Sequence, residues 1–299
     1  MVSVPAPAKV NLFLRILARE DSGYHQLETL FAALEFGDEV TVSLRGNGIS
    51  LNVDGPHLGP EKRNLAYRAA EGFLSCAGRE VGVQIDLSKR IPLRGGLGGG
   101  SSDAGAVLSA LDALLPGWVR RTELYDIARR LGSDVAFFLS PSPLALAWGR
   151  GDRILALPPL PKVPVIVSIP PAGVSTPEAY RRLSETRPTG HLTQATPAWT
   201  VEDFSSWQRV GEKAHNDFEG VVVSGHPLLG PLRHALAESG PMFSLLSGSG
   251  AALFAVFETD DLAQAAIDQL RPDFPDTRFV LTHTLTQVED PSPGPGVEG

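Results

Sequence analysis

PLRGGLGGGSSDAG, residues 92–105, is the stretch that decides how the rest of this chain is interpreted. Five glycines fall within six residues, and two serines and a segment of helical spacing follow them. Glycine lacks Cβ, so its backbone adopts positive φ, approaches a ligand closely and can turn successive N–H groups toward an anion. The start of the following helix adds unpaired N–H groups and the positive end of its dipole. The stretch therefore predicts a loop that holds a polyphosphate; the alternative is a flexible Gly/Ser linker.

The composition bounds the class of protein. A chain of 299 residues is long enough for one large or two ordinary domains, and 42% hydrophobic with 20% charged residues is typical of a soluble globular protein. The net charge of −8 argues against a nucleic-acid or anionic-membrane surface, although a local cluster of donors would still bind an anionic substrate. We expect no nucleic-acid partner and no membrane partner, and a monomer or weak homodimer.

Cysteine usage and the N-terminus indicate the compartment. Cys76 is the one cysteine, which excludes an intrachain disulfide or a cysteine-rich metal site and fits a reducing compartment. The N-terminal residues MVSVPAPAKVN lack the apolar core of a signal peptide. The longest uncharged stretch, 240–257, contains proline and glycines and fits strand–turn–strand better than a membrane span. The expected location is the cytoplasm.

Hydropathy periodicity predicts the elements of the first half. Alternating apolar residues indicate strands and a spacing of three to four residues indicates helices. Asn47-Gly48 predicts a hairpin turn between two neighbouring strands, and Ser101 or Ser102 is expected to cap the helix after the glycine run. We expect strands at 10–16, 40–44, 49–53 and 81–87, and helices at 64–77, 104–114 and 122–131.

A group of prolines, Pro158, Pro159, Pro161 and Pro164, marks a change in composition and the expected domain boundary. The predicted division is a first domain at 1–157, a second at 158–287 and a disordered tail at 288–299. Mixed strands and helices in this order indicate an α+β fold. In the second half we expect strands at 163–169, on both sides of 247–250 and at 277–285, helices at 177–184, 201–210, 227–238 and 260–270, and a mobile loop at 186–198.

The glycine run fits none of the common nucleotide-binding or catalytic patterns. No glycine precedes a lysine as a P-loop requires, and the spacing GxGxxG fails because position 101 is Ser101. The kinase triplet DFG, the elbow GxSxG and the metalloprotease pattern HExxH are absent. A functional loop here must belong to another class of phosphate-binding site.

Three segments together resemble the signatures of the GHMP small-molecule kinases: PAKVN at 7–11, the glycine run, and LLSGSGAA at 245–252. The resemblance spans residues 5 to about 285. Further motifs resemble the branch of that family that acts on 4-diphosphocytidyl-2-C-methyl-D-erythritol. These are PAKVNLFL at 7–14, GYHQLETLF at 23–31, NLAYRA at 64–69, GSDVAFF at 132–138 and STPEAY at 175–180. The glycine signature indicates only the superfamily, whereas GYH followed by LETLF is much more specific.

The resemblance implies an S5-like first domain and a ferredoxin-like second domain, with the nucleotide and the substrate in the cleft between them. It also implies ATP and Mg²⁺ as cofactors, the metal being held by phosphate oxygens, water and the hydroxyl of Ser101 or Ser102. The residues that resemble the ATP-binding part of the family are Asn64, Lys89, Pro92, Leu93, Arg94, Gly95, Gly96, Leu97, Gly98, Gly99, Gly100, Ser101 and Ser102.

Asp134 and Lys9 are the expected catalytic residues. Asp134 precedes the apolar run 135–139, where a carboxylate is costly unless it is paired or used. On sequence alone an N-cap is an equal alternative, and the resemblance favours a catalytic base or hydroxyl orienter. Lys9 would keep Asp134 ionised and neutralise the developing phosphoryl charge; the alternative is an ordinary solvated lysine.

The remaining candidates belong to the substrate pocket that the resemblance implies. An aromatic ring can stack on a pyrimidine, so Tyr24 and His25 are assigned to the cytosine end. For Phe31 and Tyr180 the alternative is core packing, for Asn11 a polar strand residue that faces water, and for the Ser-Gly-Ser-Gly segment a hairpin turn. The expected substrate-binding residues are Asn11, Tyr24, His25, Phe31, Asp134, Thr176, Pro177, Tyr180, Ser247, Gly248, Ser249 and Gly250.

The activity implied by the resemblance is ATP-dependent phosphorylation of the C2 hydroxyl of 4-diphosphocytidyl-2-C-methyl-D-erythritol. Two alternatives stay open. One is a GHMP kinase for another acceptor, such as mevalonate, homoserine or isopentenyl phosphate. The other is a non-catalytic nucleotide-binding regulator on the same fold, which intact Lys9 and Asp134 argue against.

Overall fold

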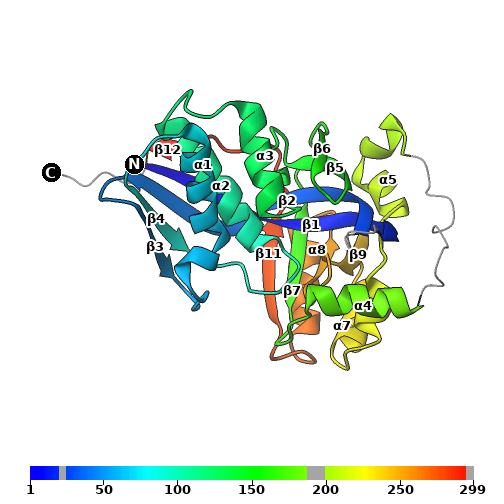
Figure 1. The fold of residues 1–299 in the computed structure, drawn as a ribbon. Helices are drawn as coiled ribbons and strands as arrows, with labels where there is room; N and C mark the ends of the chain where they lie inside the picture. Colours follow the sequence, from blue (N-terminus) through cyan, green and yellow to red (C-terminus); the bar gives the residue numbers. More distant parts are fainter. Residues whose placement is uncertain (20–24, 187–198, 294–299) are drawn as a thin grey trace.

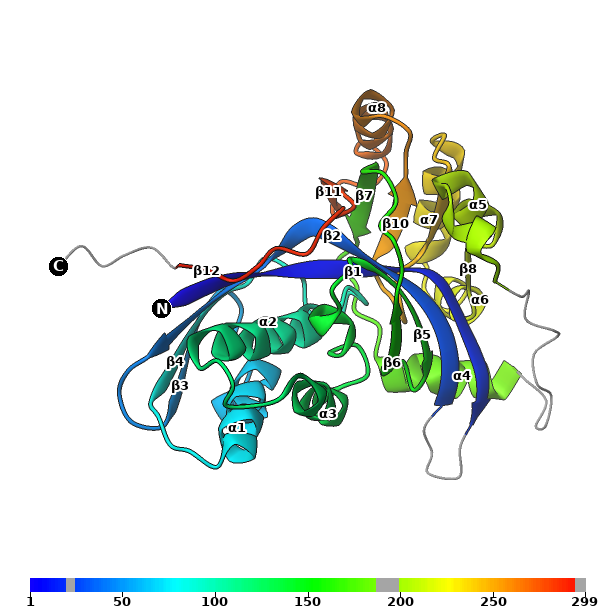
Figure 2. The same cartoon turned by 90° about the horizontal axis from the view of Figure 1, so that it is seen from above.

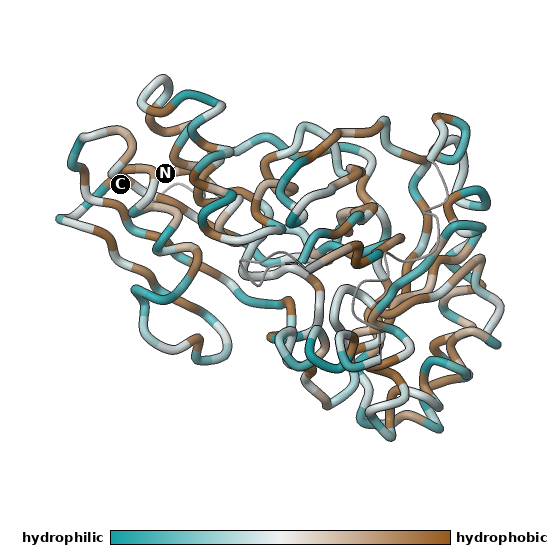
Figure 3. The backbone as a smooth tube through the Cα atoms, turned by 45° about the vertical axis from the view of Figure 1, so that its right-hand side comes forward, coloured by the Kyte–Doolittle hydropathy of each residue, from teal (hydrophilic) through white to brown (hydrophobic). Residues whose placement is uncertain are grey.

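The structure is a computed structural model that describes residues 1–19, 25–186 and 199–293 (Figure 1). In these ranges the strands form an eight-stranded sheet and a four-stranded sheet. The main path of the first sheet is β12-β1-β2-β4-β3. Off this path, β5 pairs with β2, β6 pairs with β5, and β8 pairs with β1. Brown, hydrophobic segments run through the interior of the tube, and much of the teal, hydrophilic colour lies on its outer turns (Figure 3).

Two long antiparallel strands, β1 (Val2–Arg19) and β2 (His25–Leu44), form the backbone of the first sheet (Figure 2). Their register shifts between Pro7 and Lys9 and again between Asn11 and Phe13. Such irregularities bend a strand and change the direction of its side chains. They flank Lys9 and Asn11 on both sides, so they set the direction in which these two polar side chains leave the sheet.

The expected hairpin around Asn47-Gly48 is wrong. The chain turns there, with Gly46 and Gly48 at positive φ, but β3 (Ile49–Asp54) does not pair with β2 in the described structure. Instead β4 (Val83–Ser88) lies between them, antiparallel to β2 and parallel to β3. The local turn signal was correct, whereas the pairing is decided by β4, whose alternate side chains are buried in the core.

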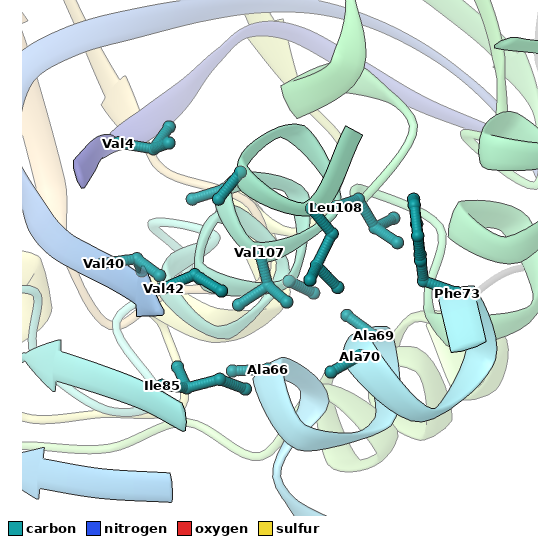
Figure 4. Packing of buried hydrophobic residues seen from close by; sticks show 14 of the residues in the cluster. Val4, Val40, Val42, Ala66, Ala69, Ala70, Phe73, Ile85, Val107 and Leu108 are labelled. Carbon is teal, nitrogen blue, oxygen red and sulfur yellow. The ribbon is translucent and has the colours of Figure 1, made fainter. Parts of the chain in front are cut away.

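Three helices cover one face of the first sheet, α1 (Leu65–Ala77), α2 (Gly99–Leu114) and α3 (Arg121–Leu131) (Figure 2). Val107 of α2 points toward Val42 and Ile85 of the strands, whereas Phe73 of α1 lies farther from the strands, beyond Leu108 (Figure 4). The expected serine cap of α2 is wrong. The helix begins inside the glycine run, after Gly98 in the left-handed conformation, so both serines lie within its first turn.

The second sheet has the order β11-β7-β10-β9. The predicted helix at 201–210 is divided into a 3-10 turn (Val201–Phe204) and α5, because Ser206 caps a new start by accepting from the N–H of Arg209. The elements not yet given are η1 (Glu61–Arg63), η2 (Phe137–Leu139), β5 (Leu144–Gly149), β6 (Arg153–Ala156), β7 (Pro164–Ile169), α4 (Thr176–Thr186), α5 (Trp207–Glu212), β8 (His215–Asn216), α6 (Glu219–Val223), α7 (Leu229–Glu238), β9 (Phe243–Leu246), β10 (Leu253–Val256), α8 (Asp260–Leu270), β11 (Arg278–His283) and β12 (Ser292–Pro293).

The C-terminal segment returns to the first sheet. Ser292 and Pro293 pair antiparallel with Ser3 and Val2, so the predicted disorder from 288 on is wrong for these two residues. Residues 294–299, and residues 187–198 of the predicted mobile loop, lie outside the described ranges. Strand β6 of the first sheet ends at Ala156, and β7 of the second sheet begins at Pro164. The expected domain boundary at 157/158 lies between these two strands and stays a prediction. Among the described helices, none has the length and apolar character of a membrane span.

Candidate active site

A cavity of about 360 Å³ brings together most of the predicted site residues. Its wall comes from β1, β2, the glycine run and the start of α2, the turn before η2, α4 and the loop between β9 and β10. It therefore joins elements of both sheets. Of the predicted residues, the cavity is lined by Lys9, Asn11, Phe31, Lys89, all of 92–101, Asp134, Thr176, Tyr180, Gly248 and Ser249.

The glycine run forms a nest of backbone N–H groups. Arg94, Gly96 and Gly98 adopt φ of 56°, 76° and 74°, so left-handed residues occur at every second position. This alternation is the geometry in which successive N–H groups converge on an anion. Gly96 has a further constraint, since a Cβ there would lie 2.0 Å from the carbonyl oxygen of Ser247. Residue 96 must therefore be glycine for the two loops to meet.

The start of α2 completes the anion site. The first helical hydrogen bond runs from the N–H of Ser102 to the carbonyl of Gly98 at 2.9 Å. The N–H groups of residues 99–101 precede that bond and so have no partner within the helix. All three residues line the cavity. The positive end of the helix dipole therefore faces the space enclosed by the nest.

Lys9 and Asp134 form an ion pair in the cavity wall. Lys9 is 3% exposed, and its Nζ lies 3.5 Å from Oδ2 of Asp134, whose side chain is 31% exposed. Burial lowers the pKa of Lys9, and the charge of Asp134 offsets part of that shift. The pair is thus a desolvated ammonium beside a carboxylate that remains accessible from the cavity.

A chain of hydrogen bonds fixes the position of Lys9. Its Nζ donates to Oδ1 of Asn11 at 2.6 Å, and Nδ2 of Asn11 donates to Oγ1 of Thr29 at 2.7 Å. Thr29 in turn donates to the carbonyl of Phe13 at 2.7 Å. The interpretation of Asn11 as a strand residue facing water is wrong, since Asn11 is 3% exposed. Sequence reasoning missed Thr29, although it stands two residues before Phe31 and therefore on the same face of its strand.

Lys89 lines the cavity but is held by two carboxylates behind the loop. Its Nζ donates to Asp38 and, at 2.8 Å, to Oδ2 of Asp103. Oδ1 of Asp38 accepts from the backbone N–H groups of Arg90 and Ile91 at 2.5 and 2.8 Å. Burial raises the pKa of Asp103 to about 7, and the charge of Lys89 counteracts only part of that rise. This buried triad of Lys89, Asp38 and Asp103 ties β2 and α2 to the segment that enters the glycine run.

Sequence reasoning did not assign Asp38 and Asp103 to the site. Asp103 stands in the quoted glycine segment, directly after the two serines that were expected to cap the helix. Asp38 stands two residues before the strand expected at 40–44. Neither position shows in the sequence that both carboxylates meet one lysine.

Aromatic side chains form the end of the cavity next to α4. The rings of His25 and Tyr180 are stacked with centroids 4.4 Å apart, and Tyr180 meets Phe218 edge to face at 4.8 Å. Burial raises the pKa of Tyr180 to about 12. Phe31 lines the cavity and also packs against Phe137, with the two ring centroids 4.9 Å apart. Tyr24 lies outside the described residues, and His25 and Pro177 are not among the described residues that line the cavity.

The segment Ser247–Gly250 backs the glycine run. The hydroxyl of Ser247 donates to the carbonyl of Gly96 at 3.1 Å, and the hydroxyls of Ser249 and Thr176 are 2.8 Å apart. Gly248 and Gly250 both have positive φ. Gly248 and Ser249 line the cavity, whereas Ser247 and Gly250 lie behind them. The segment is a tight turn, as the structural alternative held, and it also forms part of the wall.

Two predicted ATP-binding residues do not line this cavity. Asn64 caps α1, its side chain accepting from the N–H of Ala66 at 2.8 Å. Ser102 is 1% exposed and lines a separate cavity of about 910 Å³, and its Oγ has no hydrogen-bond partner among the described residues. Ser101 does line the site, and its Oγ lies beside Gly132, two residues before Asp134.

Comparison with known families and proteins gives consistent matches. Residues 64–141 match the GHMP kinases N terminal domain, and residues 200–276 match GHMP kinases C terminal. The 4-diphosphocytidyl-2-C-methyl-D-erythritol kinase of Syntrophus aciditrophicus is 38% identical over 266 residues, which cover 89% of this chain and 93% of that protein. The kinase of the same name from Syntrophotalea carbinolica is 38% identical over 272 residues, with coverage of 90% and 94%.

Solved structures agree with the sequence matches. A crystal structure of 4-(cytidine 5'-diphospho)-2C-methyl-D-erythritol kinase superposes with a TM-score of 0.76 at 38% identity, covering 94% of this chain and 98% of the other. The homoserine kinase of Cytophaga hutchinsonii superposes with a TM-score of 0.73 at 19% identity, covering 97% and 96%. The second likeness is one of fold alone.

Proposed function

The chain belongs to the GHMP kinases, and from that premise we propose that it phosphorylates the C2 hydroxyl of 4-diphosphocytidyl-2-C-methyl-D-erythritol with ATP, giving the 2-phosphate and ADP. The expected α+β class and two-domain fold of this family are confirmed. The chain is a kinase of the non-mevalonate route to isoprenoid precursors, as its relatives at 36–38% identity are named for this reaction's substrate.

The proposal rests on one observation above the others: the Lys9–Asp134 pair shares a cavity with a nest of N–H groups. Phosphoryl transfer requires positioned oxygens and stabilised charge more than covalent chemistry by the protein. The nest and the start of α2 would bind the phosphates of ATP. The pair would then stand beside the terminal phosphoryl group, where the acceptor hydroxyl must enter.

Asp134 orients the acceptor hydroxyl and accepts its proton in this proposal. Its carboxylate is accessible from the cavity, unlike those of Asp38 and Asp103. Lys9 holds its positive charge beside Asp134 and where negative charge develops on the transferred group. Asn11 and Thr29 hold Lys9 in one position, so little reorganisation accompanies the reaction.

The donor set fits Mg²⁺ held largely by the nucleotide. Among the described residues, no group of three His, Cys, Asp or Glu side chains could hold a metal ion. The hydroxyl of Ser101 lies in the cavity wall next to Gly132, which makes it a suitable ligand together with phosphate oxygens and water. Ser102 faces the other cavity, so we assign the metal to Ser101 rather than Ser102. When bound, Mg²⁺ would neutralise charge on the phosphate oxygens.

The aromatic end of the cavity suits the cytidine part of the acceptor. Tyr180 lines the wall, and the His25 ring stacks against it. A planar base can stack on such rings, and this gives the site a reason to prefer a cytidine diphosphate over a small alcohol. We also propose a cytoplasmic protein, a monomer or weak homodimer, without nucleic-acid or membrane partners, in keeping with the net charge of −8.

A panel of acceptors tests the assignment. The purified protein is mixed with ATP, Mg²⁺ and, in turn, 4-diphosphocytidyl-2-C-methyl-D-erythritol, mevalonate, homoserine or isopentenyl phosphate, and ADP release is followed. We expect ADP release with the first compound only, and NMR of the product should place the new phosphate on C2. Turnover with another acceptor instead would contradict the proposal, and ATP consumption without any acceptor dependence would favour a different role.

A further inference from the structure

Arg94 adopts a backbone conformation that favours glycine. Its φ is 56°, and no other non-glycine residue in the described ranges has a positive φ. L-residues rarely occupy this region because Cβ approaches the following carbonyl oxygen. Conformations of this kind persist where the surrounding structure requires them, often at functional sites. In Arg94 the conformation continues the alternation of Gly96 and Gly98, so the nest extends by one residue that carries a side chain.

The guanidinium of Arg94 differs from the other cations in the cavity wall. Lys9 is paired with Asp134, and Lys89 is paired with two buried carboxylates. Arg94 lines the cavity with an exposed side chain and has no hydrogen bond or ion pair with any residue in the described ranges. It is therefore the cation in this wall whose hydrogen-bonding capacity is free for a ligand.

The side chain of Arg94 leans toward the acceptor side of the cavity. A Cβ built on Gly173 would lie 3.8 Å from both Cβ and Cδ of Arg94, so the side-chain stem runs along the segment before α4. That segment leads directly into Thr176 and Tyr180, which line the wall. The nest N–H groups belong to the backbone of the same loop, whereas the Arg94 side chain extends from it toward α4.

We infer that Arg94 binds the diphosphate of the acceptor and thereby selects a nucleoside diphosphate over a small neutral alcohol. The inference rests on the proposed function and refines it, because the sequence placed Arg94 only with the ATP-binding loop. A guanidinium forms charge-assisted, often bidentate hydrogen bonds to phosphate oxygens. The phosphates of ATP offer the same chemistry, so the test must distinguish the two sources.

Binding of four compounds distinguishes them without requiring turnover. Isothermal calorimetry compares cytidine with CDP and adenosine with ADP, for the wild type and for Arg94→Gly. We expect the preference for CDP over cytidine to fall about tenfold or more in Arg94→Gly, and the preference for ADP over adenosine to change by less than about twofold. Arg94→Lys should retain part of the CDP preference, since it keeps the charge but loses the planar fork.

The stability of the variants identifies a merely structural role. Glycine relieves the left-handed strain, so Arg94→Gly should melt at the same temperature as the wild type or about 2 °C higher. Arg271→Ala, at the exposed end of α8, is the matched control for loss of one positive charge and should leave all four affinities unchanged.

Three results would overturn the inference: an unchanged CDP preference, an equal loss of the ADP preference, or a lower melting temperature in Arg94→Gly. None of them depends on turnover. A wild type that prefers CDP through Arg94 but phosphorylates none of the acceptors would contradict the proposed function and leave this inference standing. If the wild type phosphorylates the acceptor and Arg94→Gly keeps the CDP preference, the proposed function stands and this inference is overturned.

Discussion

Two lysines near the glycine run are both buried beside carboxylates, yet their surroundings differ. Lys9 lies 3.5 Å from an Asp134 carboxylate whose side chain is 31% exposed. Lys89 bonds directly to Asp38 and Asp103, which are 0% and 1% exposed. The first carboxylate is open to a ligand, whereas the second pair is closed behind the loop. This difference separates a pair that can act on a substrate from a triad that holds the loop in place.

The same contrast appears in the surrounding hydrogen bonds. Asp38 is occupied by Lys89 and by two backbone N–H groups at the start of the glycine run. Lys9 is positioned from the other side, through Asn11 and Thr29, and its partner Asp134 stays accessible from the cavity. Removing a member of the triad should therefore mainly change stability, and removing a member of the pair should mainly change turnover.

Asp134→Ala should show the largest effect. If Asp134 orients the acceptor hydroxyl and accepts its proton, kcat should fall by about 10³-fold or more. ATP affinity and melting temperature should stay close to wild type, because Asp134 is partly exposed and lies outside the core clusters. Steady-state kinetics, nucleotide titration and thermal unfolding measure the three quantities.

Lys9→Ala, combined with Asp134→Ala, tests whether the two residues act as a unit. The double variant should lose little more kcat than Asp134→Ala alone, since the partner has already lost its role. A near-normal kcat in Asp134→Ala, or additive losses in the double variant, would contradict the assignment of the pair.

Lys89→Met should show the next largest effect, and on stability. It removes the ammonium from two buried carboxylates while keeping an apolar stem of similar length. Leaving buried charge unpaired costs about 3–5 kcal/mol, which for a chain of this size lowers the melting temperature by roughly 6–10 °C.

Lys162→Met is the matched control for the triad. Its partner Glu35 is 40% exposed, so the pair is solvated and its loss should change stability by less than about 1 kcal/mol. Equal effects of the two substitutions would mean that the triad does not hold the loop.

The pH dependence of kcat tests the role of Lys9 in the ion pair. Burial lowers the pKa of Lys9 from its ordinary value of 10.5. If the ammonium is the active form, kcat should decline as pH rises through that lowered pKa, so the alkaline limb should begin below pH 10.5. Lys9→Arg should show lower kcat but no such limb, because a guanidinium does not titrate there. An identical alkaline limb in both proteins would assign it to another group.

The parts of the site that local sequence encodes were predictable. Alternation on β1 placed Lys9 and Asn11 on one face, and the density of glycine predicted the phosphate loop, because both signals depend on neighbours within a few residues. The helix after the loop was also predicted, but its start was misplaced. The left-handed Gly98 begins α2 earlier than a serine cap would.

Features that depend on long-range pairing were not predictable. The meeting of Asp38 and Asp103 at Lys89 requires β2 and α2 to lie against one another, although Asp38 and Lys89 are 51 residues apart. The insertion of β4 between β2 and β3 overrode a correct turn signal for the same reason. Likewise, Ser101 and Ser102 are neighbours in the sequence, and only the packing of α2 directs them to different cavities.

Asp103→Asn tests the triad by the pH dependence of its stability. Burial raises the pKa of Asp103 to about 7 in the folded state, against 3.8 for an ordinary aspartate. Between about pH 4 and pH 7 the folded protein therefore binds more protons at this site than the unfolded chain. Stability contributed by Asp103 falls as pH rises through that window and is constant above it.

Asparagine does not titrate, so Asp103→Asn should gain melting temperature relative to the wild type as pH rises from about 4 to about 7. The comparison uses the difference between the two proteins at each pH, which cancels the other titrating groups to first order. Asp276→Asn, at an exposed position, should show no such trend. If the difference instead moved in favour of the wild type as pH rises, Asp103 would be a carboxylate stabilised by Lys89 rather than penalised by burial. The triad would then be an ordinary buried ion pair, closer to Lys9–Asp134 than the geometry indicates.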